Sequence, residues 1–236
     1  MLDKVLDRLL EAGVAYVGQP VESNALSDPA LAVLPSDYRE TLQRLNGFSV
    51  HGGANRLFGI RPDAYMDIRA WNQESRWRFA WDRRVGPYLV IGETFFGDLY
   101  ALKHADPSDG YLPEIYLLEA NFLEPEVIAD TFTEFLEEEL LRIAVEPYDD
   151  IDIAAVEKFG SVDPSRNLVY SPSIALGGPE DVQNLMAMDA FTAMVIAGDI
   201  AQAIESAPED AVLTGVVPWV DESGRSRIRV EFREEG

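Results

Sequence analysis

Carboxylates are the most concentrated side chains in this sequence that could do chemistry. Between Lys103 and Lys158 there are sixteen Asp and Glu residues against three Lys and Arg, so this quarter of the chain carries more than half of the formal net charge of −23. Carboxylates in such numbers could attract an electropositive partner or could only keep the protein soluble. The candidate partner-binding acids come from two stretches: Asp130, Glu134, Glu137, Glu138, Asp149, Asp150 and Asp152.

These acids do not form a recognisable metal or catalytic motif. Asp149, Asp150 and Asp152 lack the mid-loop glycine and final glutamate of a calcium loop, so no metal site is predicted. The sequence has no cysteine, only His51 and His104 as imidazoles, and no G-x-S-x-G or S-x-x-K pattern. Paired carboxylates are so abundant that no single pair identifies an acid–base site. We therefore expect no catalytic residue, no cofactor and no enzymatic activity.

Net charge and hydropathy narrow the classes of partner. A formal net charge of −23 produces a field that repels nucleic acid phosphates and anionic lipids. No apolar run is long enough to span a bilayer, and charged residues occupy the N-terminal positions where a signal peptide needs an apolar core. We expect a cytoplasmic protein that binds neither nucleic acid nor membrane.

Helical periodicity predicts the elements that would carry the acids. Within residues 34–46, Tyr38, Leu42 and Leu45 share one face, and Asn46-Gly47 can end the helix. A stronger pattern is predicted to begin at Pro125, since proline favours the first helical turn. The acids between residues 130 and 138 would form one stripe of that helix.

Short apolar runs predict a sheet between these two helices. Strand candidates occupy residues 76–81, 87–91, 95–102 and 114–118, and the first alternates Arg with aromatic residues. Because the runs follow one another after short turns, they predict a mostly antiparallel meander.

Residues 146–236 have a different texture. They contain a proline-interrupted strand pattern, a helix whose predicted cap is Asp189, and two apolar runs that flank residues 221–225 as in a hairpin. No linker rich in Gly, Ser or Pro precedes them. We expect residues 1–145 to form a core and residues 146–236 an extension packed on the same sheet, with one continuous domain as the alternative.

The order of short motifs resembles the SUKH superfamily. LPSDYRETLQRLNGF is followed by LFGI, WNQESRWRFAW, FFGDLYALK and ADTFTEFLEEEL. SUKH members share this order of an L-P to N-G-F start, a strand ending in F-G, a W-N segment, an F-G-D strand and an S/T-F-x-E-F-L helix. The later stretch FGSVDPSRNLVYSPSIALGGPEDVQNL is similar to the branch found as immunity proteins to type VI secretion DNase effectors.

The resemblance implies both a fold and a function. It implies an α+β fold, with a twisted, mainly antiparallel sheet, packed helices and a C-terminal strand-helix-hairpin extension. It also implies a protein that binds and occludes a cognate toxin, without catalysis. An acidic surface suits a toxin with a basic cleft because complementary charge accelerates encounter. A scaffold or regulator of cell-envelope synthesis, a role also associated with SUKH proteins, is the alternative.

Overall fold

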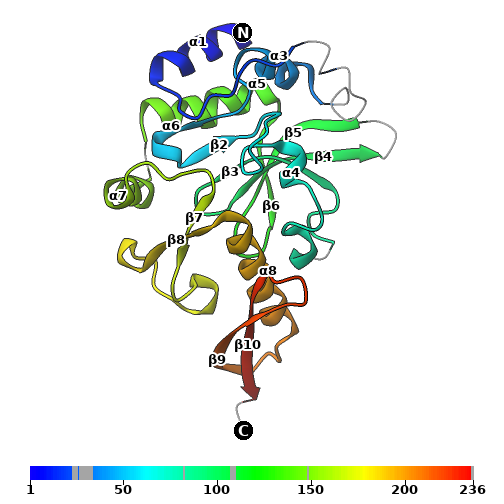
Figure 1. Ribbon diagram of the computed structural model, residues 1–236, viewed down its shortest axis with the longest axis vertical. Coiled ribbons are helices and arrows are strands. Elements are labelled where there is room, and N and C mark those ends of the chain that lie inside the picture. The colour runs from blue at the N-terminus through cyan, green and yellow to red at the C-terminus, as the bar shows by residue number, and fades with distance from the viewer. Residues whose placement is uncertain (23–25, 27–33, 82, 107–109, 148, 235–236) are drawn as a thin grey trace.

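The computed structural model shows an α+β fold built on an antiparallel sheet (Figure 1). It describes residues 1–22, 26, 34–81, 83–106, 110–147 and 149–234. Within these residues six strands pair in the order β1-β2-β3-β4-β5-β6, which confirms the predicted antiparallel meander. Their bounds are β1 Phe48–Val50, β2 Asn55–Leu57, β3 Tyr88–Thr94, β4 Leu99–Asp106, β5 Gly110–Leu118 and β6 Pro125–Ala129.

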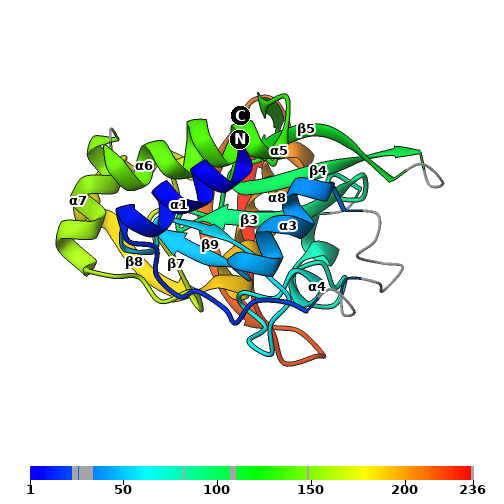
Figure 2. The same ribbon diagram turned by 90° about the horizontal axis from the view of Figure 1, so that it is seen from above.

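A layer of helices lies over one face of this sheet (Figure 2). Its members are α1 Leu2–Ala12, α3 Ser36–Arg44, and a long helix composed of α5 Phe132–Phe135, a π-helical turn Leu136–Leu141 and α6 Arg142–Val145. The long helix, called the α5–α6 helix below, runs beside α1 in both views. Val5, Leu6 and Leu9 of α1 are buried, as their helical spacing requires for packing against this layer.

Helix α3 is fastened to the rest of this layer by its first turns. Tyr38 and Leu42 are buried, as predicted, and the Tyr38 hydroxyl donates to the Phe58 carbonyl at 2.8 Å. The Tyr38 ring stacks on Phe132 with centroids 4.6 Å apart. The Asp37 carboxylate accepts from the Thr133 amide at 3.0 Å and hydroxyl at 2.9 Å. These contacts hold α3 against the start of the α5–α6 helix.

The strand predicted at residues 76–81 is wrong, because this segment forms a turn and the short 3-10 helix Arg78–Trp81, called η3. Both Trp77 and Trp81 are fully buried. The Trp77 indole N–H donates to the Trp71 carbonyl and that of Trp81 to the Met194 carbonyl, each at 2.8 Å. An alternation of basic and aromatic residues over only six positions is compatible with a strand or with a tight helical turn. The two indole hydrogen bonds to distant backbone carbonyls favour the helical turn.

The helix predicted to begin at Pro125 begins later. Pro125–Ala129 is strand β6, which pairs antiparallel with β5. The helix starts at Phe132 with Thr131 as its N-cap, because the Thr131 hydroxyl accepts from the Glu134 amide at 3.2 Å. Proline is tolerated at the first residue of an edge strand as well as in the first turn of a helix. Pro125 alone therefore could not show whether a strand or a helix begins there.

Within its described residues, the C-terminal third adds two further antiparallel strand pairs, two α-helices and two short 3-10 helices. Strand β7 pairs with β8 and strand β9 with β10. Its α-helices and strands are α7 Asp150–Phe159, β7 Arg166–Tyr170, β8 Leu185–Asp189, α8 Ala190–Ser206, β9 Ala211–Val220 and β10 Ser226–Glu234. The short helix α4, Ile68–Trp71, lies earlier in the chain, between β2 and β3. The predicted Asp189 cap is confirmed, because its carboxylate accepts from the Thr192 amide at 2.9 Å.

Helix α8 connects the β9–β10 hairpin to the main core. Phe191, Met194 and Val195 are buried in the same hydrophobic cluster as the strands of the large sheet. On the other side of α8, the Asp199 carboxylate accepts from the Arg227 Nε at 2.8 Å and from the Ile228 amide at 3.1 Å. Among the described residues, no helix has the length and apolar character needed to cross a membrane.

Candidate functional site

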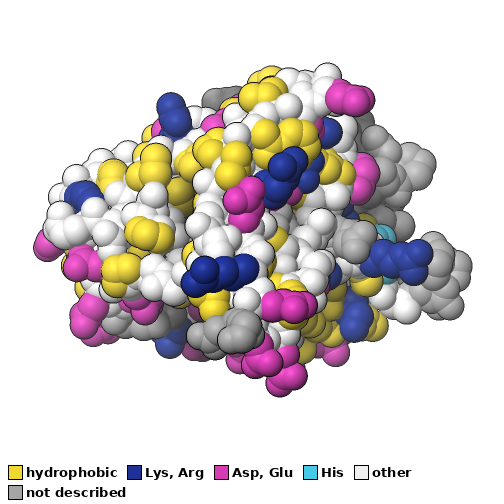
Figure 3. Space-filling model, turned by 90° about the horizontal axis from the view of Figure 1, so that it is seen from below, with side chains coloured by type: hydrophobic (Ala, Val, Ile, Leu, Met, Phe, Trp, Pro, Cys, Tyr) yellow, Lys and Arg dark blue, Asp and Glu magenta, His cyan; other side chains and the backbone are white. Residues whose placement is uncertain are grey.

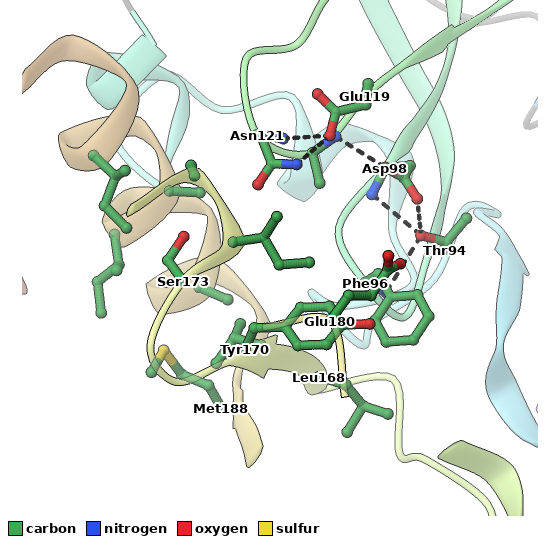
Figure 4. A pocket seen from close by; sticks show the side chains of 18 of the residues that line it. Thr94, Phe96, Asp98, Glu119, Asn121, Leu168, Tyr170, Ser173, Glu180 and Met188 are labelled. Atoms are coloured by element: carbon green, nitrogen blue, oxygen red, sulfur yellow. Dashed lines mark hydrogen bonds between the residues drawn. The ribbon is translucent and has the colours of Figure 1, made fainter. Parts of the chain in front are cut away.

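A cavity of about 780 Å³ lies between the large sheet and the C-terminal third of the chain. Its walls come from the turn between β3 and β4, the loop after β5, the α5–α6 helix, the start of α7, β7 and β8, α8 and the β9–β10 hairpin. Figure 4 shows Thr94, Asp98, Glu119 and Asn121 on one side, with Ser173 and Met188 on the other. The elements that form it are far apart in sequence, so only the folded chain creates it.

The charged side chains around this cavity are all acidic within the part of the chain that the structure describes. They are Asp98, Glu119, Glu139, Asp149, Asp152 and Glu180, and no Lys, Arg or His from the described residues lines the cavity with them. Arg142, one turn along from Glu139, approaches it from outside the lining, with Nη2 3.8 Å from Oε2. The cavity is therefore a site of negative potential.

Asp98 is held in place by the turn between β3 and β4. Its carboxylate accepts from the Thr94 hydroxyl at 2.8 Å and from the Ala120 amide at 2.9 Å. Burial raises the pKa of Asp98, and these two hydrogen bonds lower it in part because they stabilise the carboxylate. The network fixes the orientation of this acid without neutralising it.

A second hydrogen-bonded chain reaches the cavity from β2. The Asn55 Nδ2 donates to the Tyr100 hydroxyl at 2.5 Å, and that hydroxyl donates to Glu139 Oε1 at 3.2 Å. Burial raises the pKa of Glu139, and the hydrogen bond from Tyr100 and the charge of Arg142 lower it. Among the described residues, no donor reaches the buried Oδ1 of Asn55.

Asp152 shows the electrostatic consequence of gathering these acids. Burial is the largest cause that raises the pKa of Asp152 to about 7, followed by repulsion from Asp149, Asp98 and Glu139. Asp149 is exposed and caps α7, accepting from the Ile151 amide at 2.9 Å. The start of α7 therefore places Asp149 and Asp152 at the cavity and leaves Asp150 in solvent outside it.

The pKa of Asp152 predicts a pH dependence of stability. In the unfolded chain an Asp titrates near pH 4. Between about pH 4 and pH 7 the folded protein binds the additional proton, so the free energy of unfolding falls as the pH rises through that window. Asp152→Asn removes this penalty. We expect the free energy of unfolding of the variant to be about 1–2 kcal/mol higher than that of the wild type at pH 8, after allowance for solvent screening. Near pH 4 the two free energies of unfolding should be equal.

Urea unfolding at several pH values tests this expectation. Asp150→Asn is the matched control, because it removes the same formal charge from the same helical turn at an exposed position outside the cavity. An equal gain in the free energy of unfolding for both variants would contradict the raised pKa assigned to Asp152. A gain for Asp152→Asn that does not change with pH would contradict it as well.

The apolar part of the cavity provides a surface that a partner could desolvate. Phe96 stacks on Tyr170 with ring centroids 5.9 Å apart and an interplanar angle of 19°. Met186, Met188 and Ile196 add aliphatic and thioether surface. A polar rim around an apolar centre is typical of protein interfaces and of ligand sites.

The structure separates the predicted interface acids into two groups. Asp149 and Asp152 line the cavity, and Asp150 lies beside them in solvent. The other four lie just before and within the α5–α6 helix, outside the cavity lining: Asp130, Glu134, Glu137 and Glu138.

Two acids of the second group have local partners. Glu134 Oε2 accepts from the Asp130 amide at 2.9 Å, in a capping arrangement, and Glu137 pairs with Arg8 of α1 at 3.3 Å. Asp130 precedes the helix, and both Asp130 and Glu138 are exposed. Asp130 therefore does not belong to the expected acidic helical stripe, whereas Glu134, Glu137 and Glu138 lie on the helix.

Sequence reasoning missed the cavity acids that come from other elements. Asp98 follows a glycine in a strand pattern, and Glu139 is the last of three consecutive glutamates. Glu139 lies three residues after the buried Leu136, and residues three apart share one face of a helix. This spacing was the available signal that Glu139 turns inward. Asn55 carried no such signal.

A metal ion does not match the arrangement of these acids. Across the described ranges, no three or more His, Cys, Asp or Glu side chains come together in a way that could hold a metal ion. The acids surround a wider space, which suits a larger cation or a segment of another molecule.

A second surface feature lies on the β9–β10 hairpin. Figure 3, which views the molecule from below, shows hydrophobic side chains on this face with Lys, Arg, Asp and Glu side chains among them. Strand β9 exposes Leu213, Val216, Val217, Trp219 and Val220. Leu213 and Val216 also line the cavity, so this apolar surface continues from its wall.

Comparisons with known proteins place the fold. The crystal structure of Atu4351 from Agrobacterium tumefaciens matches with a TM-score of 0.54 and 11% identity, over 93% of this chain and 95% of that chain. At this identity the likeness shows the fold alone, and it extends through the C-terminal elements. No curated protein sequence matches. Residues 31–138 match the model of the SMI1 / KNR4 family (SUKH-1). This match identifies a SUKH-1 domain in residues 31–138 of the chain.

Proposed function

We propose that this protein is an immunity protein that binds a secreted bacterial toxin and neutralises it by occlusion. The observation that carries the proposal is the acidic, partly apolar cavity, together with the exposed acids next to it, on a SUKH fold. A toxin that acts on nucleic acid must present a basic surface to the phosphates. We therefore propose a nuclease, delivered by type VI secretion and bound in the cytoplasm, as the partner.

The proposed mechanism is competition for the basic cleft of the toxin. The charge of −23 accelerates encounter with a cationic surface and acts over about 8–10 Å at physiological salt. Tight binding needs, in addition, a desolvated centre, which the apolar wall around Phe96 and Tyr170 supplies. No group on this protein needs to react, because the bound toxin cannot reach its substrate.

Co-expression with the product of the adjacent reading frame in a sensitive host tests the function. We expect the neighbour to kill the host and this chain to restore growth. A toxic neighbour that this chain does not neutralise would overturn the proposal. Purification of a stable multiprotein complex that contains no toxin would instead support a scaffold in cell-envelope synthesis.

The contribution of the exposed acids can be measured with the same partner. Replacing Asp130, Glu138 and Asp150 by lysine should slow association by at least about tenfold at low salt, because complementary charge mainly accelerates encounter, and the difference should shrink at high salt. The matched control is a second triple variant, Glu209→Lys, Asp210→Lys and Glu222→Lys, which changes the net charge by the same amount. Glu209 and Asp210 are exposed acids in the loop before β9, and Glu222 is an exposed acid in the turn between β9 and β10. Equal slowing by both triple variants would show that only net charge matters and would remove these acids from the interface.

A further inference from the structure

The cavity gathers acceptor side chains, and no Lys, Arg or His among the described residues lines it. Glu139 and Asp152 face it from different elements, and burial raises the pKa of both. Each additional acid makes the ionised form of the others less stable, as the repulsion on Asp152 shows. An inserted cation would remove this repulsion.

Asn55 provides an independent indication of a missing donor. Asn55 lines the cavity and is 3% exposed, yet within the described chain its Oδ1 has no hydrogen-bond partner. The amide orientation is set by its neighbour, because the Tyr100 hydroxyl accepts from Asn55 Nδ2 and donates to Glu139. A buried acceptor without a donor costs about 1–3 kcal/mol, which a ligand N–H would recover.

The chemistry of the walls restricts the ligand further. The acceptors are a carboxamide oxygen and carboxylates, whereas Ile143, Ile151 and Leu168 provide an apolar approach to them. A guanidinium or ammonium group on an aliphatic stem satisfies both requirements, since such side chains bury their methylene groups and donate from the charged end. The volume of about 780 Å³ exceeds what one side chain fills, so flanking residues of a peptide segment would enter as well.

We propose that this cavity captures an arginine or lysine side chain of the toxin, with Asn55, Glu139 and Asp152 as its hydrogen-bond acceptors. The inference rests on the proposed function for the identity of the partner, but not for the chemistry of the ligand. Charge-assisted hydrogen bonds of this kind are roughly twice as strong as neutral ones. The inserted side chain would be the anchor of the interface, and the exposed acids would mainly guide the encounter.

The test uses a peptide-like probe and not the toxin. Acetyl-arginine-methylamide is titrated into the full chain and followed by NMR, with acetyl-citrulline-methylamide as the neutral probe of the same shape. We expect saturable shifts at residues 55, 139 and 152 with the arginine compound only, and a lower pKa of the Asp152 carboxyl when it is bound. Asp152→Asn should weaken binding by about tenfold, the loss expected for one charge-assisted hydrogen bond.

Asp150→Asn is again the matched control and should bind the arginine compound as the wild type does. Equal binding of the citrulline compound, or equal losses in Asp150→Asn and Asp152→Asn, would overturn the proposal. A competition experiment with the toxin separates the two hypotheses. Slower toxin association in excess arginine compound supports insertion of a toxin side chain. Arginine binding without such competition would leave a cation site for a free amine or guanidine and would overturn its assignment to the toxin.

Discussion

Arg56→Met is expected to lower the free energy of unfolding by about 3–5 kcal/mol, because it leaves a buried carboxylate without its cation. Arg56 and Glu93 are both fully buried, with Nη1 and Oε1 2.9 Å apart. Burial raises the pKa of Glu93, and Arg56 together with Asn167 lowers it. Without Arg56, Glu93 must either remain charged in the core or bind a proton.

The other hydrogen bonds of Arg56 join the sheet to the start of β7 and the residues just before it. Its guanidinium donates to the Asn167 Oδ1 at 3.0 Å, to the Pro164 carbonyl at 3.2 Å and to the Arg166 carbonyl at 2.7 Å. The Nε donates to the Gly53 carbonyl at 3.1 Å. Methionine fills a similar volume but donates to none of these oxygens, so the loss includes unsatisfied carbonyl groups.

Urea unfolding measures this loss, with Arg8→Met as the matched control. Arg8 pairs with Glu137 on the surface, and an exposed pair contributes about 0–1 kcal/mol. The double variant Arg56→Met, Glu93→Met should recover part of the loss, because removing both charges avoids an unpaired one. A loss for Arg56→Met no larger than that for Arg8→Met would contradict the structural role given to the buried pair.

This buried pair also shows where sequence reasoning stops. Arg56 and Glu93 are single charged residues outside the predicted strands. The partners of Arg56, Glu93 and Asn167, are 37 and 111 positions away from it. Periodicity reports which face of an element is apolar, whereas the choice of charged residues inside the core depends on tertiary neighbours. No local pattern distinguished Arg56 from a solvent-exposed arginine.

The fold was more predictable than the site. The meander, the helix at Tyr38, the Asp189 cap and the final hairpin all follow from local periodicity and turn chemistry. The late start of the α5–α6 helix was also readable, because Thr131 and Glu134 form a Thr-x-x-Glu capping pattern that is a stronger signal than Pro125. The apolar alternation at residues 76–81 was too short to separate a strand from a helical turn.

The cavity was only partly predictable. The acid-rich stretch that contains Asp149 and Asp152 does contribute to it, because charge concentration is visible in the sequence. Asp98 and Tyr100 come from a segment whose pattern indicated only a strand, and Asn55 of β2 lay outside the predicted elements. Their convergence depends on how the C-terminal third packs against the sheet, which local patterns do not specify.

The C-terminal third packs on the rest of the chain through a buried tryptophan of η3. Trp81→Ala is expected to lower the free energy of unfolding by about 3–5 kcal/mol, the range for truncating a buried aromatic side chain. Trp81 is fully buried, and its indole N–H donates to the Met194 carbonyl of α8 at 2.8 Å. The α8 backbone approaches closely here, because a Cβ added at Gly198 would lie 2.5 Å from the Ala80 carbonyl oxygen. Gln202 Nε2 donates to that same oxygen at 2.6 Å.

We propose that residues 1–145 and 146–236 unfold as one cooperative unit because of this contact between η3 and α8. Urea unfolding of Trp81→Ala followed by circular dichroism and by the remaining tryptophans should then give one coincident transition at lower urea. Trp219→Ala is the matched control: it removes the same side chain from the exposed hairpin, where Trp219 is 41% exposed, and should cost much less. Two separate transitions in the wild type would show that the C-terminal third folds independently. In that case the cavity would lie between two units that fold separately. Trp81→Ala would then abolish the proposed cation binding while the sheet stays folded.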